Sequence, residues 1–345
     1  MNHRLHVLCL LILFILSSTF IGCSQNRPDQ TFRIAFYNVE NLFDTIPNPM
    51  KDDLNFTPGS RARWNTERYN KKLVDLAKVV EDMDHPPILG LAEVENALVL
   101  NDFCKAIGKP YYSFIHHESP DNRGIDVALL YQPEYFRPLA DEALPLQIDI
   151  NGVDRFTRDI LYVTGIFLPT QDTLDLYINH WPSRRGGLAQ SEHRRLAAAD
   201  TLINHINLLK SHRHQPNIII MGDFNDEPSN KSIKRIIDSQ KNKTPFALFN
   251  AAHKAHKKGK GTYNYRGTWN MLDQFIISEH MTNTSTSGLK FYEFTVFDPP
   301  FLIFDHPRFG RTPNRTYGGP NYYGGTSDHL PIFMDIYHID IDNDR

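Results

Sequence analysis

The chain has 345 residues, of which 41% are hydrophobic and 22% are charged, and its formal net charge at pH 7 is -3. This composition excludes a collagen-like, low-complexity or disordered protein and allows a large buried core. It also argues against a general nucleic-acid coat protein, which would need a broad basic surface, so any phosphate recognition must be local.

The amino-terminal segment has the pattern of an export signal. Arg4 precedes an unbroken apolar run over residues 7–16, which is shorter than the roughly 20 residues that cross a bilayer. Residues 20–23 resemble a bacterial lipobox, so we predict a lipoprotein-type signal peptide over residues 1–22, a lipid anchor at Cys23 and a tether over residues 23–30. Secretion without lipid remains an alternative, because Phe20 stands where the motif usually has Leu.

From Thr31 onward, short apolar runs alternate with helical patterns without an internal repeat, so we predict one domain over residues 31–345. The predicted helices cover residues 67–82, 96–107, 191–210 and 229–238. The predicted strands cover residues 32–39, 88–94, 113–117, 125–131, 161–167, 174–180, 217–221, 273–278, 291–297 and 329–336. Residues 250–267 and 301–325 have the character of long loops.

This pattern contains too many strands for a single parallel sheet with a helix in every crossover. We therefore predict an α+β fold in which two packed sheets are flanked by helices. Several strands end in polar residues that are unfavourable to bury, and such strand ends usually carry the functional residues of a sheet-based protein.

Two motifs at strand ends carry most of the chemistry. In residues 218–226 an apolar strand delivers Asp223 and Asn225 onto a turn that Gly222 opens. The second motif, Ser327-Asp328-His329, places an acid and an imidazole at the start of the last strand. Each motif taken alone is also compatible with a capping role for its polar side chains.

Together with five further motifs, these two resemble the endonuclease/exonuclease/phosphatase superfamily, which includes nucleases, sphingomyelinases and inositol polyphosphate phosphatases. The motifs follow the family's order and are Phe36–Asn41, Leu91–Val94, Arg123–Asp126, Ile178–Arg184, Gly222–Asn225, Met271–Asp273 and Ser327–His329. The resemblance implies a four-layer α/β/β/α sandwich with two mixed sheets. It also implies hydrolysis of phosphoesters with a divalent cation.

The resemblance further implies roles for single residues. Glu93, with Asn38 beside it, would be the main metal ligand, and Asp328 would be a further ligand. Oxygen ligands of this kind suit Mg²⁺ or Mn²⁺. His329 would be the catalytic imidazole, and Asp273 would orient it.

The remaining roles concern water and phosphate. Asp223 and Asn225 would position or deprotonate the attacking water and hold the scissile phosphate. His180 would donate a hydrogen bond to a phosphate oxygen, and Arg184 and Asn179 would contact the substrate phosphate. A phosphodiester repels nucleophiles because it is anionic, so such donors, a cation and a base are all needed.

Basic residues near the motifs bear on the substrate. Arg184 and Arg185 follow His180, and residues 194–195 are arginines that either face phosphate or lie on an exposed helix face. The segments 253–260 and 301–325 are rich in Lys or Arg, the second with interleaved Tyr. Such segments either bind bases and backbone phosphates or order a loop over the site.

We therefore predict an exported, membrane-anchored lipoprotein that acts as an Mg²⁺-dependent endonuclease on DNA or RNA, without an obligate protein partner. One alternative is a phosphatase or sphingomyelinase-like phosphodiesterase with a substrate other than nucleic acid. A second alternative is a non-catalytic surface binding lipoprotein on the same scaffold.

Overall fold

The computed structural model describes residues 28, 30–150, 152–209, 211–241 and 246–341. The described residues from Thr31 onward form one compact unit. The predicted signal peptide, Cys23 and most of the predicted tether lie outside the described residues. Within the described ranges, we find no helix that is both long and apolar enough to span a membrane.

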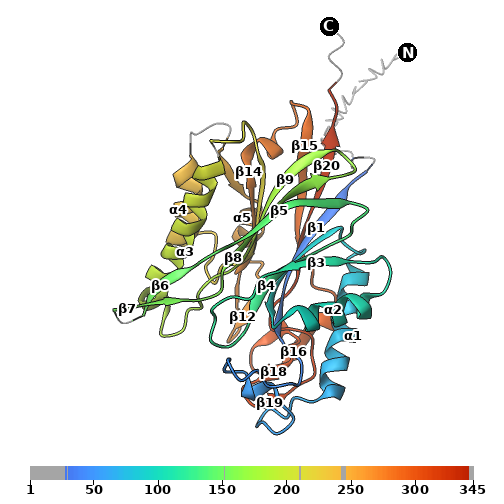
Figure 1. The fold of residues 1–345 in the computed structure, drawn as a ribbon, viewed down its shortest axis with the longest axis vertical. Coiled ribbons are helices and arrows are strands. Elements are labelled where there is room, and N and C mark those ends of the chain that lie inside the picture. The colour runs from blue at the N-terminus through green and yellow to red at the C-terminus, as the bar shows by residue number, and fades with distance from the viewer. Residues whose placement is uncertain (1–27, 29, 151, 210, 242–245, 342–345) are drawn as a thin grey trace, which may run out of the picture. The chain divides into compact units, whose positions relative to one another are not determined.

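Two six-stranded mixed sheets form the centre of the unit (Figure 1). The first sheet has the order β15 (Gly288–Val296), β20 (Ile332–Ile339), β1 (Phe32–Leu42), β2 (Ile88–Val94), β4 (Asp126–Tyr131), β3 (Ser113–His116). The second has the order β11 (Leu248–Asn250), β14 (Asp273–Ser278), β10 (Asn217–Asp223), β9 (Asp172–His180), β8 (Ile160–Phe167), β5 (Phe136–Leu144).

Helices cover the outer face of each sheet (Figure 1). The helices α1 (Thr66–Asp82) and α2 (Ala97–Ile107) lie against the first sheet, and α3 (Leu188–Leu209) and α4 (Lys231–Gln240) lie against the second. Asn65 and Asn96 cap the first two helices, because their side chains accept the otherwise unpaired N–H groups of the first turn. The four layers confirm the α/β/β/α sandwich.

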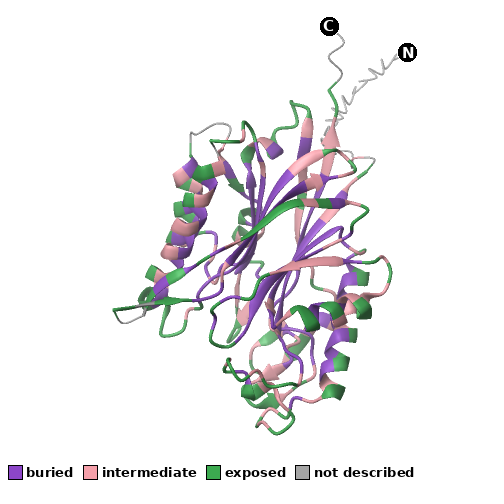
Figure 2. Cartoon of the chain, viewed as in Figure 1, coloured by how far each residue is buried: buried purple, intermediate pink, exposed green. Residues whose placement is uncertain are grey.

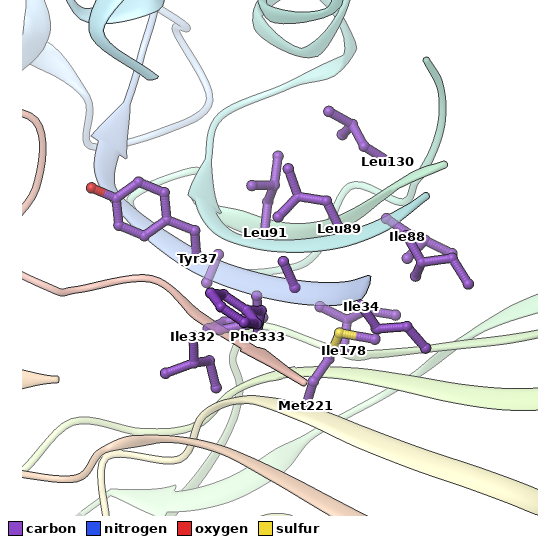
Figure 3. Packing of buried hydrophobic residues seen from close by; sticks show 14 of the residues in the cluster. Ile34, Tyr37, Ile88, Leu89, Leu91, Leu130, Ile178, Met221, Ile332 and Phe333 are labelled. Atoms are coloured by element: carbon purple, nitrogen blue, oxygen red, sulfur yellow. The ribbon is translucent and has the colours of Figure 1, made fainter. Parts of the chain in front are cut away.

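The core lies between the two sheets and again beneath α3 and α4 (Figure 2). Successive residues of a strand point to opposite faces, so Ile219 and Met221 of β10 pack against the first sheet, whereas Ile218 and Ile220 pack under α3 and α4. Figure 3 shows Met221 beside Ile178 and close to Ile34 of the first sheet. The continuous apolar run of β10 thus fills two layers.

The central strands of each sheet run parallel, which brings their carboxyl ends together. β1 pairs with β2, and β9 pairs with β10, in parallel register. Residues at the carboxyl ends of parallel strands meet at one edge of a sheet, which is the usual place for a ligand site. Here those ends carry Asn38, Glu93, His180 and Asp223.

The structure differs from the predicted elements where the periodic signal is weak. β5 was not predicted, because it is an edge strand whose exposed positions and Pro138 hide the alternation. The last strand begins at Ile332, three residues after the predicted start at His329, because residues 327–331 form a connection ahead of it.

The two segments predicted as loops contain short elements. These are α5 (His253–Lys257) and the hairpins β12 (Tyr263–Tyr265) with β13 (Thr268–Asn270), β16 (Ile303–His306) with β17 (Gly310–Pro313), and β18 (Tyr317–Gly318) with β19 (Asn321–Tyr322). A further hairpin joins β6 (Gln147–Ile150) to β7 (Val153–Phe156). Strands of two to four residues are too short to show a period of two in the sequence.

A substitution at Gly90 of β2 can test the packing between the sheets. A Cβ atom on Gly90 would lie 2.8 Å from Met221 Sδ and 3.0 Å from Phe36 Cδ2. We expect Gly90→Val to overfill this space and to lower the free energy of unfolding by about 1–3 kcal/mol in urea titrations. Gly59→Val is the control, because nothing lies within 4 Å of a Cβ atom there. Equal unfolding midpoints for the two variants would contradict the packing described.

Candidate active site

A cavity of about 1170 Å³ opens at the carboxyl ends of the central strands. Its walls also include residues 183–188, the hairpin β12–β13 and part of the segment 315–320. Seven of the residues predicted for the site line it, namely Glu93, His180, Arg184, Asp223, Asn225, Asp328 and His329. Asn38 and Asp273 are buried behind them and hydrogen-bond to lining residues.

A bulge at the end of β2 aims Glu93 into the cavity. The register with β4 shifts between Ala92 and Val94, and Glu93 has a left-handed φ of 66°. Its Oε2 accepts the backbone N–H of Asn41 at 2.9 Å. The side chain is 15% exposed, so its carboxylate can reach a ligand in the cavity.

Asn38 joins the two sheets below the cavity. Its Nδ2 donates to Asp223 Oδ2 at 3.1 Å and to Glu93 Oε1 at 3.4 Å, and its Oδ1 accepts the backbone N–H of Glu40 at 3.0 Å. The amide therefore presents N–H groups, and not its oxygen, to the two acids. In this geometry Asn38 positions both acids, and the metal-ligand role that the resemblance implies for it stays a prediction.

Asp223 ends β10 in a tight, buried position. Its Oδ1 accepts the backbone N–H of Asn225 at 2.8 Å, and a Cβ atom on Gly222 would lie 2.3 Å from the carbonyl oxygen of Asn179, so only glycine fits before it. Burial raises the pKa of Asp223 to about 6, with the charges of Asp273 and Glu93 acting in the same direction and His329 opposing them.

His329 forms an acid–imidazole pair with Asp273. Its Nδ1 lies 2.7 Å from Asp273 Oδ2, and its Nε2 lies 3.7 Å from Asp223 Oδ2. Burial alone would lower the pKa of His329, but the charges of Asp273 and Asp223 outweigh it and raise that pKa well above its usual range. The imidazole is therefore cationic near neutral pH and presents its Nε2–H toward Asp223.

His180, unlike His329, is a neutral imidazole near neutral pH. Its Nε2 lies 3.7 Å from both Glu93 Oε1 and Asp223 Oδ2. Burial lowers the pKa of His180 well below its usual range, and the nearby charges of Arg158 and Arg123 lower it further. A neutral imidazole with its proton on Nε2 can donate a hydrogen bond into the cavity.

Arg158 was not predicted and holds the backbone beneath His180. Its Nε donates to the carbonyl oxygen of His180 and its Nη2 to that of Trp181, both at 3.1 Å, while Nη1 lies 2.7 Å from Asp121 Oδ2. Nothing in the sequence marks a single Arg before a strand as buried, because its burial depends on partners more than 20 residues away.

Two predicted phosphate contacts have different surroundings. Asn179 lies outside the cavity lining, where its amide donates to the carbonyl oxygens of Tyr177 and Met221 and its Oδ1 accepts the indole N–H of Trp181. It therefore supports the core and is not placed to contact phosphate. Arg184 lines the cavity, but its Nε already donates to Asn225 O at 2.7 Å.

The arginines at 194 and 195 do not form a phosphate-facing pair. Arg195 is fully buried, and its Nε lies 2.8 Å from Asp226 Oδ2. Asp226 also accepts a hydrogen bond from the hydroxyl of Ser232, so it links Arg195 of α3 to Ser232 of α4. The ion pair between Arg195 and Asp226 thus stabilises the packing of α3 against α4.

The residues present fit a divalent cation. Glu40, Glu93, Asp223 and Asp328 line the cavity and offer the hard oxygen ligands that Mg²⁺ and Mn²⁺ prefer. Burial raises the pKa of Glu40 to about 7 and that of Asp223 to about 6, and the charges of neighbouring acids act in the same direction. Glu93 and Asp328 would hold the cation, although Asp328 is also paired with Arg315 at 2.9 Å.

Ligand atoms of Asp223, Asp273 and His329 also lie within 4.8 Å of one another. Because Nδ1 of His329 is already engaged by Asp273, we interpret this group as the acid–imidazole pair together with Asp223, and not as the primary cation site. The arrangement places an acid, a cationic imidazole and a neutral imidazole around one space.

Comparison with known proteins gives one family. A model of the Endonuclease/Exonuclease/phosphatase family matches residues 33–338. A search of the curated proteins found no match. Several solved structures share the fold, at 14–16% sequence identity in the three cases that follow.

The first is an endonuclease/exonuclease/phosphatase family protein from Bacteroides thetaiotaomicron, with a TM-score of 0.60, 15% identity and coverage of 92% of this chain and 98% of that chain. The second is a mannosyl-6-phosphatase from the same species, with a TM-score of 0.58, 16% identity and coverage of 90% of this chain and 100% of that chain. The third is D. rerio TDP2 complexed with single strand DNA product, with a TM-score of 0.56, 14% identity and coverage of 90% of this chain and 100% of that chain.

The cation site can be tested without an activity assay. We expect Mg²⁺ to raise the melting temperature, because a ligand that binds only the folded state adds about 2.7 kcal/mol at roughly a hundredfold excess over Kd. Glu93→Gln should abolish this shift, and EDTA should reverse it in the unaltered protein. Glu134→Gln, on an exposed glutamate outside the cavity, should retain the full shift. An unchanged shift in Glu93→Gln would remove Glu93 from the cation site.

Proposed function

Because the chain belongs to the endonuclease/exonuclease/phosphatase family of metal-dependent phosphoesterases, we propose that it is an exported, Mg²⁺-dependent endonuclease that hydrolyses phosphodiesters in DNA or RNA. The observation that carries this proposal is the pairing of His329 with Asp273 beside the buried Asp223, at the floor of an acidic cavity with a basic rim.

The rim favours a polymeric anion over a small monoester. Among the described residues, five arginines and no lysine line the cavity. Arg61 and Arg185 are exposed at the cavity and form no ion pair or hydrogen bond with another described residue, so both can bind a ligand. Tyr263, Tyr265 and Phe56 also line the walls, where aromatic rings can stack on bases.

The side chains supply a complete set of roles for attack by water on phosphorus. Asp223, whose pKa burial raises to about 6, orients the water and accepts its proton as the new P–O bond forms and one ester P–O bond breaks. The Nε2–H groups of His329 and His180 donate to oxygens that gain charge. A bound divalent cation would neutralise charge on the phosphate and the leaving oxygen.

Removing the imidazole tests this assignment. We expect His329→Ala to lower kcat for a generic phosphodiester by about 10²–10⁴-fold, because proton transfer and charge stabilisation by such a group contribute that much. Asp273→Asn should give a smaller loss by misorienting the ring. His338→Ala is the matched control, since His338 also pairs with an acid, Asp172, at 3.2 Å but lies outside the cavity lining. Full activity in His329→Ala would refute the proposed chemistry.

The substrate class needs a direct comparison. Plasmid DNA, RNA, sphingomyelin and inositol phosphates should be incubated with the protein in Mg²⁺ and again in EDTA. Cleavage of nucleic acid in Mg²⁺ alone would support the proposal. Preferential turnover of sphingomyelin or inositol phosphates would favour the other phosphoesterase activities, and stoichiometric binding without turnover would favour a binding lipoprotein.

Export and lipid attachment rest on the amino-terminal sequence. We propose that residues 1–22 are removed and that Cys23 carries the lipid, which would anchor the enzyme on the periplasmic or cell-surface side of a membrane. Labelled palmitate should enter the unaltered protein in bacterial cells, and Cys23→Ala should abolish the labelling. Cys104→Ala should label normally. Labelling that persists in Cys23→Ala would exclude this anchor.

A further inference from the structure

Two segments of this acidic protein carry basic residues and no acidic ones. Residues 251–270 and 306–327 contain eight of the 37 Lys and Arg residues and none of the 40 Asp and Glu residues. These segments include the hairpin β12–β13 and, from His306 onward, the turn and second strand of the hairpin β16–β17, whose first strand also carries Asp305. A strong local excess of positive charge in a chain of net charge -3 indicates a surface for an anionic partner.

The two hairpins lie side by side and continue the wall of the cavity. Asn264 Nδ2 donates to the carbonyl oxygen of Arg311 at 3.3 Å, and a Cβ atom on Gly267 would lie 3.6 Å from the carbonyl oxygen of Phe309. Tyr263 and Tyr265 of the first hairpin line the cavity itself. Because Arg266 directly follows Tyr265, the turn of β12–β13 adjoins the cavity wall, and the hairpin β16–β17 lies beside it.

The turn of the first hairpin carries an unusual residue. Tyr265 pairs with Thr268, so Arg266 and Gly267 form a two-residue turn with φ of 53° and 94°. Such turns favour Asn, Asp or Gly at both positions, because L-residues with longer side chains are strained there. Arg266 is exposed, has no ion pair with a described residue, and lies 5.3 Å from the centre of the Tyr265 ring.

The turn of the second hairpin repeats this combination. Arg308 is exposed, has no ion pair with a described residue, and lies 5.3 Å from the ring of Phe309, which stacks on His306 at 4.6 Å. Arg311 differs, because Asp298 lies 4.0 Å from it and Asp305 faces it in the ladder. Of the three arginines in these two hairpins, Arg266 and Arg308 are therefore the two without an ion pair to a described residue.

We propose that the turns of β12–β13 and β16–β17 form a docking surface for single-stranded nucleic acid beyond the scissile phosphate, with Arg266 and Arg308 as backbone phosphate contacts and Tyr265 and Phe309 as stacking surfaces. The proposal rests on the proposed nuclease function and specifies that its substrate is single-stranded. A cation next to an aromatic ring suits a single strand, since stacking requires bases that are not paired within a duplex.

The experiment uses binding, so it does not depend on hydrolysis. Fluorescence anisotropy with a labelled single-stranded oligonucleotide in EDTA gives Kd as a function of salt. Arg266→Asn and Arg308→Gln should each weaken binding and reduce the slope of log K against log salt by about 0.7, the value for one phosphate contact on a single strand. The double variant should lose about twice as much.

Two controls separate binding from folding. Asn tolerates the left-handed turn better than Arg does, so Arg266→Asn should unfold in urea at the same or a higher midpoint than the unaltered protein. Arg155→Asn, on an exposed arginine of the hairpin β6–β7, should leave both Kd and the slope unchanged.

The outcomes for the docking surface and for the nuclease activity are distinct. Unchanged affinity and slope in the double variant, or equal dependence of duplex binding on both arginines, would overturn the docking surface even if nucleic acid is cleaved. Arginine-dependent binding of single strands without cleavage in Mg²⁺ would support the docking surface and overturn the nuclease activity. An absence of binding by the unaltered protein would overturn the docking surface.

Discussion

The hydrogen bond from Asn38 to Asp223 is the contact on which the geometry of the site depends. It joins β1 of the first sheet to β10 of the second, and both side chains are almost fully buried. Because the same amide also donates to Glu93, the spacing of the two acids follows from how the sheets pack. A buried carboxylate needs such donors, since an unpaired charge in the interior is strongly destabilising.

Around that contact, the backbone adopts conformations that ordinary residues avoid. Glu40, Asn41, Glu93 and Asn225 all have positive φ, and all four line the cavity. Each such residue costs on the order of 1–3 kcal/mol unless its surroundings hold it in place. Here the supports are the N–H of Asn41 on Glu93 and the carboxylate of Asp223 on Asn225. The fold therefore holds strained backbone where its polar groups converge.

Much of the fold was predictable, because apolar runs and strand ends are local features. β2 and β14 have the predicted limits, as expected for short apolar strands buried in the centre of a sheet. The edge strand β5 and the small hairpins were missed, since exposed or very short strands leave no periodic signal. The convergence of Glu93 and His329 on one cavity agrees with the motif order.

The roles of the amide and charged side chains were harder to predict. An Asn can present its oxygen or its N–H groups, and the contacts of Asn38 and Asn179 depend on partners in neighbouring strands. Arg195 looked like a surface residue, but its partner Asp226 follows a different strand and removes it from solvent.

By itself, the sequence determined which chemical groups stand at the strand ends, because short apolar runs and glycine turns are encoded locally. Only the tertiary structure decided which atom each group presents and which histidine is charged. His180 and His329 are the same residue type and are both buried. His329 is cationic because Asp273 contacts it directly, and His180 is neutral because burial and Arg158 act against its protonation.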